Sequence, residues 1–350
     1  VPARDPAALG MLAVPGNELS KDNTNSWSER TGGQFNHHND FFTGRHGQEF
    51  ASLQESYAYT YALGGMQIIN HPGQYWNLST TYSETEKNGP GWHATNFKTY
   101  PSLVGLEVYN QGNRRPNDRI LWDQILERTM PERPVFGYSG DDTHNDEQLF
   151  RNYNMMLMEE LTTEELKDAM RKGESYFCYE PKGSGEGKAP RITNIAVDEA
   201  NKTITIETNG MVSWIYGTDM TSSSSSSTRS SVVGIGNTFC YEGYQGAYVR
   251  AFITNAYGET CTQPFGFTDS TTTDVDNVAD NTELKVFVFP NPATDELRVM
   301  MNQANTAELI SVYDITGKEV MRQPVEGALT TLPVSQLHTG IYLLTVNGRQ

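Results

Sequence analysis

Cysteine, positive charge and long apolar runs are all scarce in this chain of 350 residues. Its three cysteines are Cys178, Cys240 and Cys261, and none has the Cys-x-x-Cys spacing of a zinc site. Lysine and arginine number 26 against 43 aspartates and glutamates, so the formal net charge at pH 7 is −17. Nucleic-acid binding needs a basic footprint and is therefore not expected. No apolar run approaches the roughly 20 residues of a membrane-spanning helix, so no transmembrane segment is predicted.

Residues 1–180 alternate short strands with helices. Helical spacing and capping signals predict helices over 48–63, 117–128 and 162–173. Apolar runs predict strands over 65–72, 103–109 and 136–139. Because strands that alternate with helices form parallel sheets, this part of the chain predicts a parallel sheet or barrel.

The rest of the chain has a β pattern. Residues 188–268 predict a small antiparallel β-sandwich, residues 269–283 a polar linker, and residues 284–350 a further β domain. Four aromatic residues of the sandwich either pack in its core or form a carbohydrate-binding platform: Trp214, Tyr241, Tyr244 and Tyr248.

The segment from Gly140 to His144, with the sequence Gly-Asp-Asp-Thr-His, follows an apolar strand and carries two carboxylates and an imidazole. Successive strand residues point to opposite faces, so Asp142 and His144 share one face. Such a pair at a strand end can bind a divalent metal. A solvated loop of the same composition is the alternative.

Other metal-ligating side chains stand at further predicted strand ends within residues 1–180. They are Glu18, the adjacent His37 and His38, and His71. In parallel α/β folds, side chains at the carboxyl ends of the strands converge. We therefore predict that these residues form a multi-metal site with Asp142 and His144.

Five short motifs occur in residues 1–180 in the order typical of one enzyme family. They are Pro15-Gly16-Asn17-Glu18, His37-His38-Asn39, Asn70-His71-Pro72, Gly105-Leu106-Glu107-Val108 and the Gly140 to His144 segment. With them, this part of the chain resembles the PHP (polymerase and histidinol phosphatase) family. The opening His-x-His and Thr-Asp-His motifs of the family are absent, and we expect them upstream of Val1. The resemblance implies a distorted (β/α)7 barrel that lacks its first two units.

The resemblance also implies a metal-dependent phosphoesterase with two or three divalent ions (Mn, Zn or Fe), in which a metal-bound hydroxide attacks phosphorus. The implied catalytic residues are Glu18, Asp142 and His144. The implied metal ligands are Glu18, His37, His71, Asp142 and His144, with His38 in place of His37 if the register shifts by one residue. An acidic chain suits an anionic substrate once bound cations reverse the local field.

Three basic residues are expected in loops after strands: His93, Arg114 and Arg115. They either meet the substrate phosphate or are solvated. Glu107 is expected near the site without being a certain ligand. Asp141 either orients a ligand histidine or forms a turn, and His46 is predicted to be an ordinary surface residue.

Three segments near the end of the chain form a second set of motifs. They are Phe289-Pro290-Asn291-Pro292, the Val312 to Lys318 segment and the Leu337 to Leu344 segment. They resemble the C-terminal sorting domain of type IX secretion cargo. This resemblance implies binding to the type IX secretion machinery, and release or attachment at the cell surface. In an oxidising exterior we expect a disulfide between Cys240 and Cys261, which lie in two predicted strands of one segment.

The sequence therefore predicts a secreted metal-dependent phosphatase or phosphodiesterase, with a phosphorylated small molecule or polymer as its substrate. Two alternatives stay open. One is a non-catalytic surface binding protein with a degenerate barrel and a ligand-binding β-sandwich. The other keeps the metals but hydrolyses a different bond, such as an amide.

Overall fold

The computed structural model describes residues 6–19, 37–44, 52–183, 187–218, 230–267, 286–289, 293–301, 307–327 and 329–348. The predicted linker at 269–283 and His46 lie outside the described residues. Short 3-10 helices are η2 (Ala7–Leu9), η3 (Pro72–Gln74) and η4 (Asp146–Gln148).

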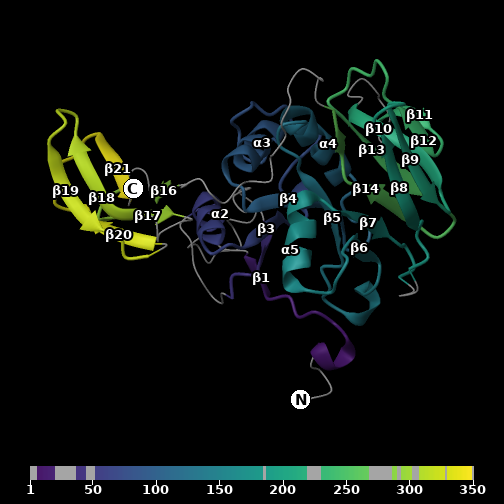
Figure 1. Ribbon diagram of the computed structural model, residues 1–350, viewed down its shortest axis with the longest axis horizontal. Coiled ribbons are helices and arrows are strands. Elements are labelled where there is room, and N and C mark those ends of the chain that lie inside the picture. The colour runs from purple at the N-terminus through teal and green to yellow at the C-terminus, as the bar shows by residue number, and fades with distance from the viewer. Residues whose placement is uncertain are drawn as a thin grey trace.

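A five-stranded mixed sheet lies at the centre of the first half of the chain (Figure 1). In spatial order its strands are β1 (Gly16–Leu19), β2 (His38–Phe41), β3 (Met66–Ile69), β4 (Leu103–Asn110) and β5 (Phe136–Gly140). Strand β2 is antiparallel to both β1 and β3, whereas β3, β4 and β5 are parallel. Strands β1, β3, β4 and β5 therefore run in one direction, and their carboxyl ends share one edge of the sheet.

The predicted (β/α)7 barrel is wrong. A barrel requires parallel strands throughout, but β2 is antiparallel to both of its neighbours. After β5, the chain forms an antiparallel pair, β6 (Asn152–Met156) and β7 (Ser175–Tyr179), which joins the sheet of the β-sandwich. Local periodicity predicts that a segment is a strand, but the direction of its partner depends on long-range packing.

Helices cover both faces of the mixed sheet. Helices α2 (Leu53–Ala62), α3 (Pro90–Thr99) and α4 (Asp118–Thr129) contribute to the core on one face, and α5 (Thr163–Lys172) to the core on the other. Strand β4 is buried along its whole length because both of its faces are covered. The side chains of Ser52 and Thr162 cap α2 and α5, and Pro90 begins α3.

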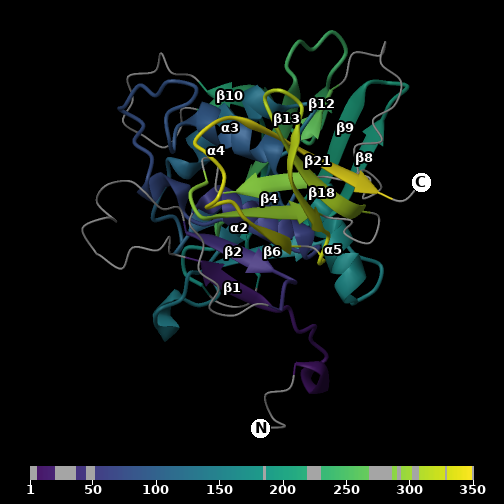
Figure 2. The same cartoon turned by 90° about the vertical axis from the view of Figure 1, so that its left-hand side faces the viewer.

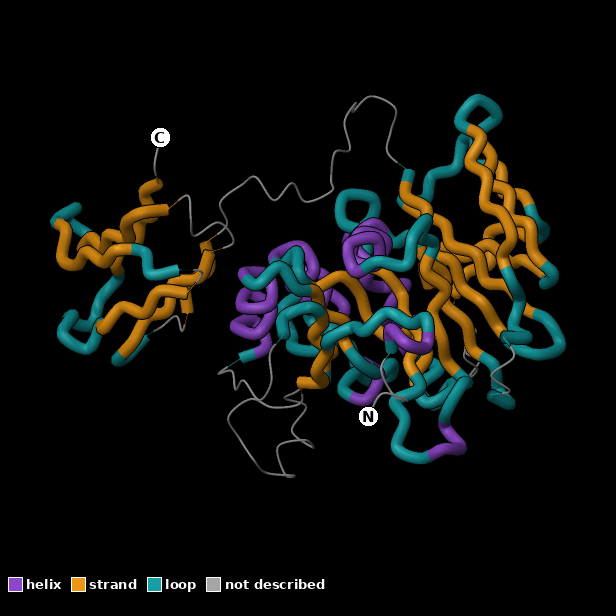
Figure 3. Tube along the Cα trace, turned by 60° about the horizontal axis from the view of Figure 1, so that its bottom comes forward, coloured by secondary structure: helices purple, strands orange, loops and turns teal. Residues whose placement is uncertain are grey.

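The β-sandwich has two sheets (Figure 3). In the larger sheet the order is β11-β10-β13-β14-β7-β6, and β15 pairs with β13. These strands are β10 (Met211–Thr218), β11 (Ser230–Ile235), β13 (Tyr248–Thr254), β14 (Glu259–Thr262) and β15 (Phe265–Gly266), with β6 and β7 from the preceding segment. The smaller sheet has the order β12-β9-β8, with β8 (Ile192–Asp198), β9 (Thr203–Thr208) and β12 (Thr238–Cys240).

The sandwich aromatics belong to its packing. Trp214 and Tyr248 are fully buried. The rings of Tyr241 and Tyr244 pack against Phe267. Trp214 and Tyr248 therefore belong to the core, whereas Tyr241 and Tyr244 are partly buried against it.

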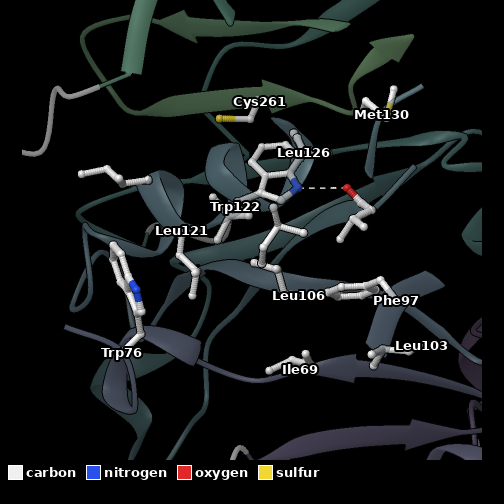
Figure 4. Packing of buried hydrophobic residues seen from close by; sticks show 14 of the residues in the cluster. Ile69, Trp76, Phe97, Leu103, Leu106, Leu121, Trp122, Leu126, Met130 and Cys261 are labelled. Atoms are coloured by element: carbon white, nitrogen blue, oxygen red, sulfur yellow. Dashed lines mark hydrogen bonds between the residues drawn. The ribbon is translucent and has the colours of Figure 1, made fainter. Parts of the chain in front are cut away.

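The largest hydrophobic core joins the helices to the sandwich. Helix α4 contacts β4 on one side and β10 on the other. Within this core, the fully buried Trp122 donates its indole N–H to the carbonyl oxygen of Val135 at 2.9 Å (Figure 4). Cys261 lies in the same core. The core therefore runs across the boundary predicted between residues 180 and 188.

The expected disulfide does not form. Cys261 is fully buried in β14 of the larger sheet, whereas Cys240 is exposed in β12 of the smaller sheet. All three cysteines are free. The prediction placed both residues correctly in strands, but it did not anticipate that these two strands belong to different sheets.

The C-terminal domain is a small sandwich of two three-stranded sheets (Figures 1 and 2). One has the order β16 (Val286–Phe289), β17 (Glu296–Met301) and β20 (Leu329–Pro333). The other has the order β19 (Glu319–Pro324), β18 (Ala307–Asp314) and β21 (Tyr342–Gly348). Arg298 of β17 forms an ion pair with Glu55 of α2 at 2.9 Å. Every helix among the described residues is too short or too polar to cross a lipid bilayer.

Candidate metal centre

The edge where β1, β3, β4 and β5 end gathers five of the predicted site residues. Glu18 is close to the end of β1, and His37 directly precedes the oppositely directed β2. His71 follows β3, and Asp142 and His144 follow β5. His71 and Asp142, for example, are 71 positions apart in the sequence but lie 4.0 Å apart in the structure, because strands β3, β4 and β5 end at the same edge of the sheet.

Glu18, His37 and His71 form the tightest group. One ligand atom of each lies within 4.8 Å of the others. His37 Nδ1 is 3.0 Å from Glu18 Oε1, and His71 Nε2 is 4.0 Å from the same oxygen. Ligands about 2.0–2.2 Å from one metal lie roughly 3–4 Å from each other. The group is therefore close to the spacing that a shared divalent ion requires.

Asp142 adds a second carboxylate next to His71. Its Oδ2 is 4.0 Å from His71 Nε2. His144 lies farther out, with a side chain that is 69 % exposed, and its Nδ1 is 3.5 Å from Asp142 Oδ1. The five side chains run from a buried histidine to an exposed one, as expected of a site that is open to solvent on one side.

The protonation states of the group suit metal binding. Burial lowers the pKa of His71 to about 4, and the neighbouring His37 acts in the same direction, so the His71 imidazole is neutral at pH 7. The hydrogen bond with His37 lowers the pKa of Glu18 to about 2, and Asn70 adds to this effect. Metals bind neutral imidazole and ionised carboxylate. In addition, Nδ1 of His71 is buried without a hydrogen-bond partner, so one polar atom of the site is left unsatisfied by the chain.

The backbone is strained at the same edge. The residues that follow β3, β4 and β5 all have positive φ: His71 at 31°, Gln111 at 45° and Asp142 at 45°. Residues other than glycine rarely adopt this conformation, and strain of this kind gathers at functional sites. Three strained residues at three successive strand ends point to the same edge as the ligand set does, and they do so independently.

A buried layer beneath the candidate ligands joins two of them, His71 and Asp142. Glu107 accepts hydrogen bonds from the backbone N–H of His71 and from Asn110 Nδ2, both at 2.9 Å. The same Asn110 nitrogen is 3.3 Å from Asp142 Oδ2. Burial raises the pKa of Glu107 to about 8. Gly140 has no side chain here because a β-carbon would collide with the Glu107 carboxylate.

Two residues of the site, Asn110 and Gln111, were not predicted from the sequence. Gln111 connects Asp142 to Arg114. Its Nε2 donates to Asp142 Oδ2 at 3.1 Å, and its Oε1 accepts from Arg114 Nη1 at 2.6 Å. The signal that was available is their position: both side chains come at the end of β4, next to the strand ends that carry the ligands.

Arg114 and Arg115 lie at the rim of the site. Arg114 reaches it through Gln111, and Arg115 Nη2 is 3.4 Å from Oε1 of Gln74, in the turn that follows His71. Both guanidinium groups are held by neutral amides. Among the described residues neither is within ion-pair distance of a carboxylate, so both keep their positive charge available for an anion.

His38 belongs to the opposite face of β2. Its side chain is buried, and its Nε2 is 2.9 Å from the hydroxyl of Ser56 in α2. Since neighbouring strand residues point to opposite faces, only His37 of the adjacent pair faces Glu18. The structure therefore does not bring His38 to the other ligands.

His93 is also separate from the exposed rim. It lies in α3, where a loop was predicted, and it is fully buried. Pro90 at the first turn of α3 was the sequence signal for this helix. A buried helical histidine has no access to a substrate phosphate.

Asp141 shapes the loop beside the site. Its carboxylate accepts the backbone N–H groups of Phe150, Arg151 and Asn152 at 2.6, 3.0 and 2.8 Å. It therefore fixes the loop that carries Asp142 and His144. Of the two roles considered for Asp141, orienting a histidine or forming a turn, the structure favours the turn.

Comparison with known proteins gives a result for the end of the chain. Residues 287–350 match the family described as the secretion system C-terminal sorting domain. No curated protein matches the chain. The sorting domain was predicted over 284–350 and is confirmed. The protein is therefore secreted by the type IX pathway, whose machinery it must contact, and reaches the cell surface.

Proposed function

We propose that the protein is a secreted, metal-dependent phosphoesterase. The observation that carries the proposal is the convergence of Glu18, His37, His71 and Asp142 at one sheet edge, with two arginines at its rim. The order of these ligands along the chain is also that of the PHP family. The proposal rests on these residues and does not depend on the barrel fold of that family.

The donor set fits hard or borderline divalent ions such as Mn, Zn or Fe, because it combines imidazole with carboxylate. The resemblance to the PHP family implies two or three such ions. Such ions polarise phosphoryl oxygens and supply a nucleophile at neutral pH. Glu18, His37, His71 and Asp142 would hold them, with His144 as an outer ligand.

The other residues of the site have roles that follow from their contacts. Glu107 and Asn110 hold the His71 and Asp142 loops in register. Gln111 holds Arg114 beside Asp142. Arg114 and Arg115 would orient the phosphate oxygens and stabilise the negative charge that develops during hydrolysis.

The experiment uses the full chain after removal of metals with a chelator. Mn²⁺, Zn²⁺ or Fe²⁺ is added back, and hydrolysis of p-nitrophenyl phosphate and bis-p-nitrophenyl phosphate is followed. We expect turnover with at least one metal and its loss in His71→Asn, whereas His338→Asn, an exposed histidine of the sorting domain, serves as the matched control. Lack of turnover with every metal, or equal turnover in His71→Asn, would reject the proposal. Turnover of an amide substrate alone would favour the other metal-dependent reaction.

A further inference from the structure

Three large apolar side chains are exposed together on the C-terminal domain. Ile315, Ile341 and Leu343 are 83, 81 and 64 % exposed. They line an open cleft of about 630 Å³, together with Tyr313 and Gly317. We call Ile315, Ile341 and Leu343 the exposed apolar patch.

The patch is formed by two segments that the sheet brings together. Strands β18 and β21 pair so that Tyr313 lies opposite Leu343. Beyond β18, the Asp314 side chain accepts the backbone N–H groups of Thr316 and Lys318, at 2.8 and 3.1 Å. This turn holds Ile315 in a fixed, outward position rather than leaving it on a loose end.

The patch does not contribute to the core of the domain. Along β21, Tyr342, Leu344 and Val346 pack against the core. Ile341 and Leu343 alternate with them and face the other way. In Figure 1, β18 and β19 lie on the side of the domain away from α2, so the patch-bearing sheet is the outer one. Within the described residues, β21 is also an edge strand.

Exposed apolar groups that neighbour one another mark interaction sites, and an edge strand offers backbone groups to a partner strand. The domain that carries the patch matches a secretion sorting domain. We propose that the exposed apolar patch, with the adjoining edge of β21, is the surface through which the type IX secretion machinery binds this protein. The complementary surface on the machinery would be apolar and would offer a strand edge. This inference is independent of the metal centre.

The test is export of the full chain from cells that possess a type IX system. The substitutions are Ile315→Thr, Ile341→Thr and Leu343→Thr, singly and combined, because threonine keeps the β preference and removes the apolar surface. We expect the exported fraction to fall about tenfold in the triple variant and severalfold in Ile315→Thr. The matched control is Ile235→Thr, which removes an 82 % exposed side chain from the sandwich.

Thermal unfolding of each purified variant separates binding from folding. Ile315 lies in a turn and makes no contribution to the core, so Ile315→Thr decides the question if the triple variant unfolds. Normal export of Ile315→Thr and of a folded triple variant would overturn the proposal. A dimer in wild type that dissociates in the triple variant, with export unchanged, would assign the patch to self-association and would also overturn it.

Discussion

Two clusters of charged side chains in this protein are built in opposite ways. In the first, the Asp123 carboxylate of α4 accepts two hydrogen bonds from Arg250 and one each from Tyr248 and Ser230. In the second, at the sheet edge, His71 is buried with an unsatisfied Nδ1, and Glu18 is partly exposed. Each cluster keeps one buried nitrogen without a hydrogen-bond partner, Arg250 Nη1 in the first and His71 Nδ1 in the second. In the first, however, a buried carboxylate and a buried guanidinium neutralise each other, whereas in the second the Glu18 and Asp142 carboxylates face His71, whose imidazole is neutral at pH 7. The balance of charge within the chain is therefore what distinguishes the structural ion pair from the candidate binding site.

The largest expected effect concerns the Asp123–Arg250 cluster. Asp123→Ala leaves the Arg250 guanidinium fully buried without a counter-ion, so we expect a loss of about 3–5 kcal/mol in the free energy of unfolding. Urea denaturation at neutral pH measures it. Adding Arg250→Met should restore part of the loss, and affinity for Mn²⁺ should stay unchanged in variants that remain folded. A parallel loss of metal affinity would break the contrast between the clusters.

At the sheet-edge cluster, His71→Asn should show the reverse pattern. Asparagine tolerates positive φ, so we expect the metal-free protein to change in stability by less than about 1 kcal/mol. Saturating Mn²⁺ at about 100 times its dissociation constant should stabilise the wild type by about 2.7 kcal/mol, and the variant by much less. Urea titrations with and without the metal provide both quantities. A strongly destabilised metal-free variant would mean that His71 is structural.

The rim arginines should affect catalysis without affecting metal binding. For Arg114→Gln we expect kcat/KM for a phosphoester to fall about tenfold to hundredfold, because the variant lacks the charged group that we propose stabilises the phosphate. Arg322→Gln, which removes an exposed arginine of the sorting domain, is the control. Steady-state kinetics and a parallel metal titration distinguish this role from a contribution to the metal site.

The smallest expected effect concerns the layer under the ligands. Asn110→Ala removes the amide that joins Glu107 to Asp142, and such outer contacts typically contribute tenfold or more to metal affinity. We expect a decrease of about tenfold, measured by calorimetric titration with Mn²⁺. The exposed Asn194→Ala in β8 is the control. Unchanged affinity in Asn110→Ala would mean that the direct ligands alone determine the affinity for the metal.

Much of the local structure was predictable, because it is encoded locally. The apolar spacing over 117–128 became α4, and the caps at Thr162 and Gly173 bound α5. The convergence of strand-end residues also followed from the sequence, since strands that run in one direction share an edge. Strand pairing was not predictable in the same way. The antiparallel β2, and the attachment of β7 to β14, depend on which apolar surfaces meet in three dimensions.

The residues of the site were also only partly predictable, because their positions depend on how the strands pair. His37 and His38 are indistinguishable as a pair of letters, and only the register of β2 decides which one faces Glu18. His93 had a plausible sequence position but lies in a buried helix. Asn110 and Gln111 carried no motif at all. Their roles appear only when the hydrogen bonds across neighbouring strand ends are known.

The most direct test of the account is a binding titration of the chelator-treated chain with Mn²⁺ or Zn²⁺, in wild type and in Glu18→Gln. Glu18 contacts both His37 and His71, so its carboxylate is central to the ligand group. The account predicts saturable binding of at least one ion per wild-type chain, and a loss of at least about a hundredfold in affinity in the variant. No saturable binding to the wild type, or equal binding to Glu18→Gln, would contradict it.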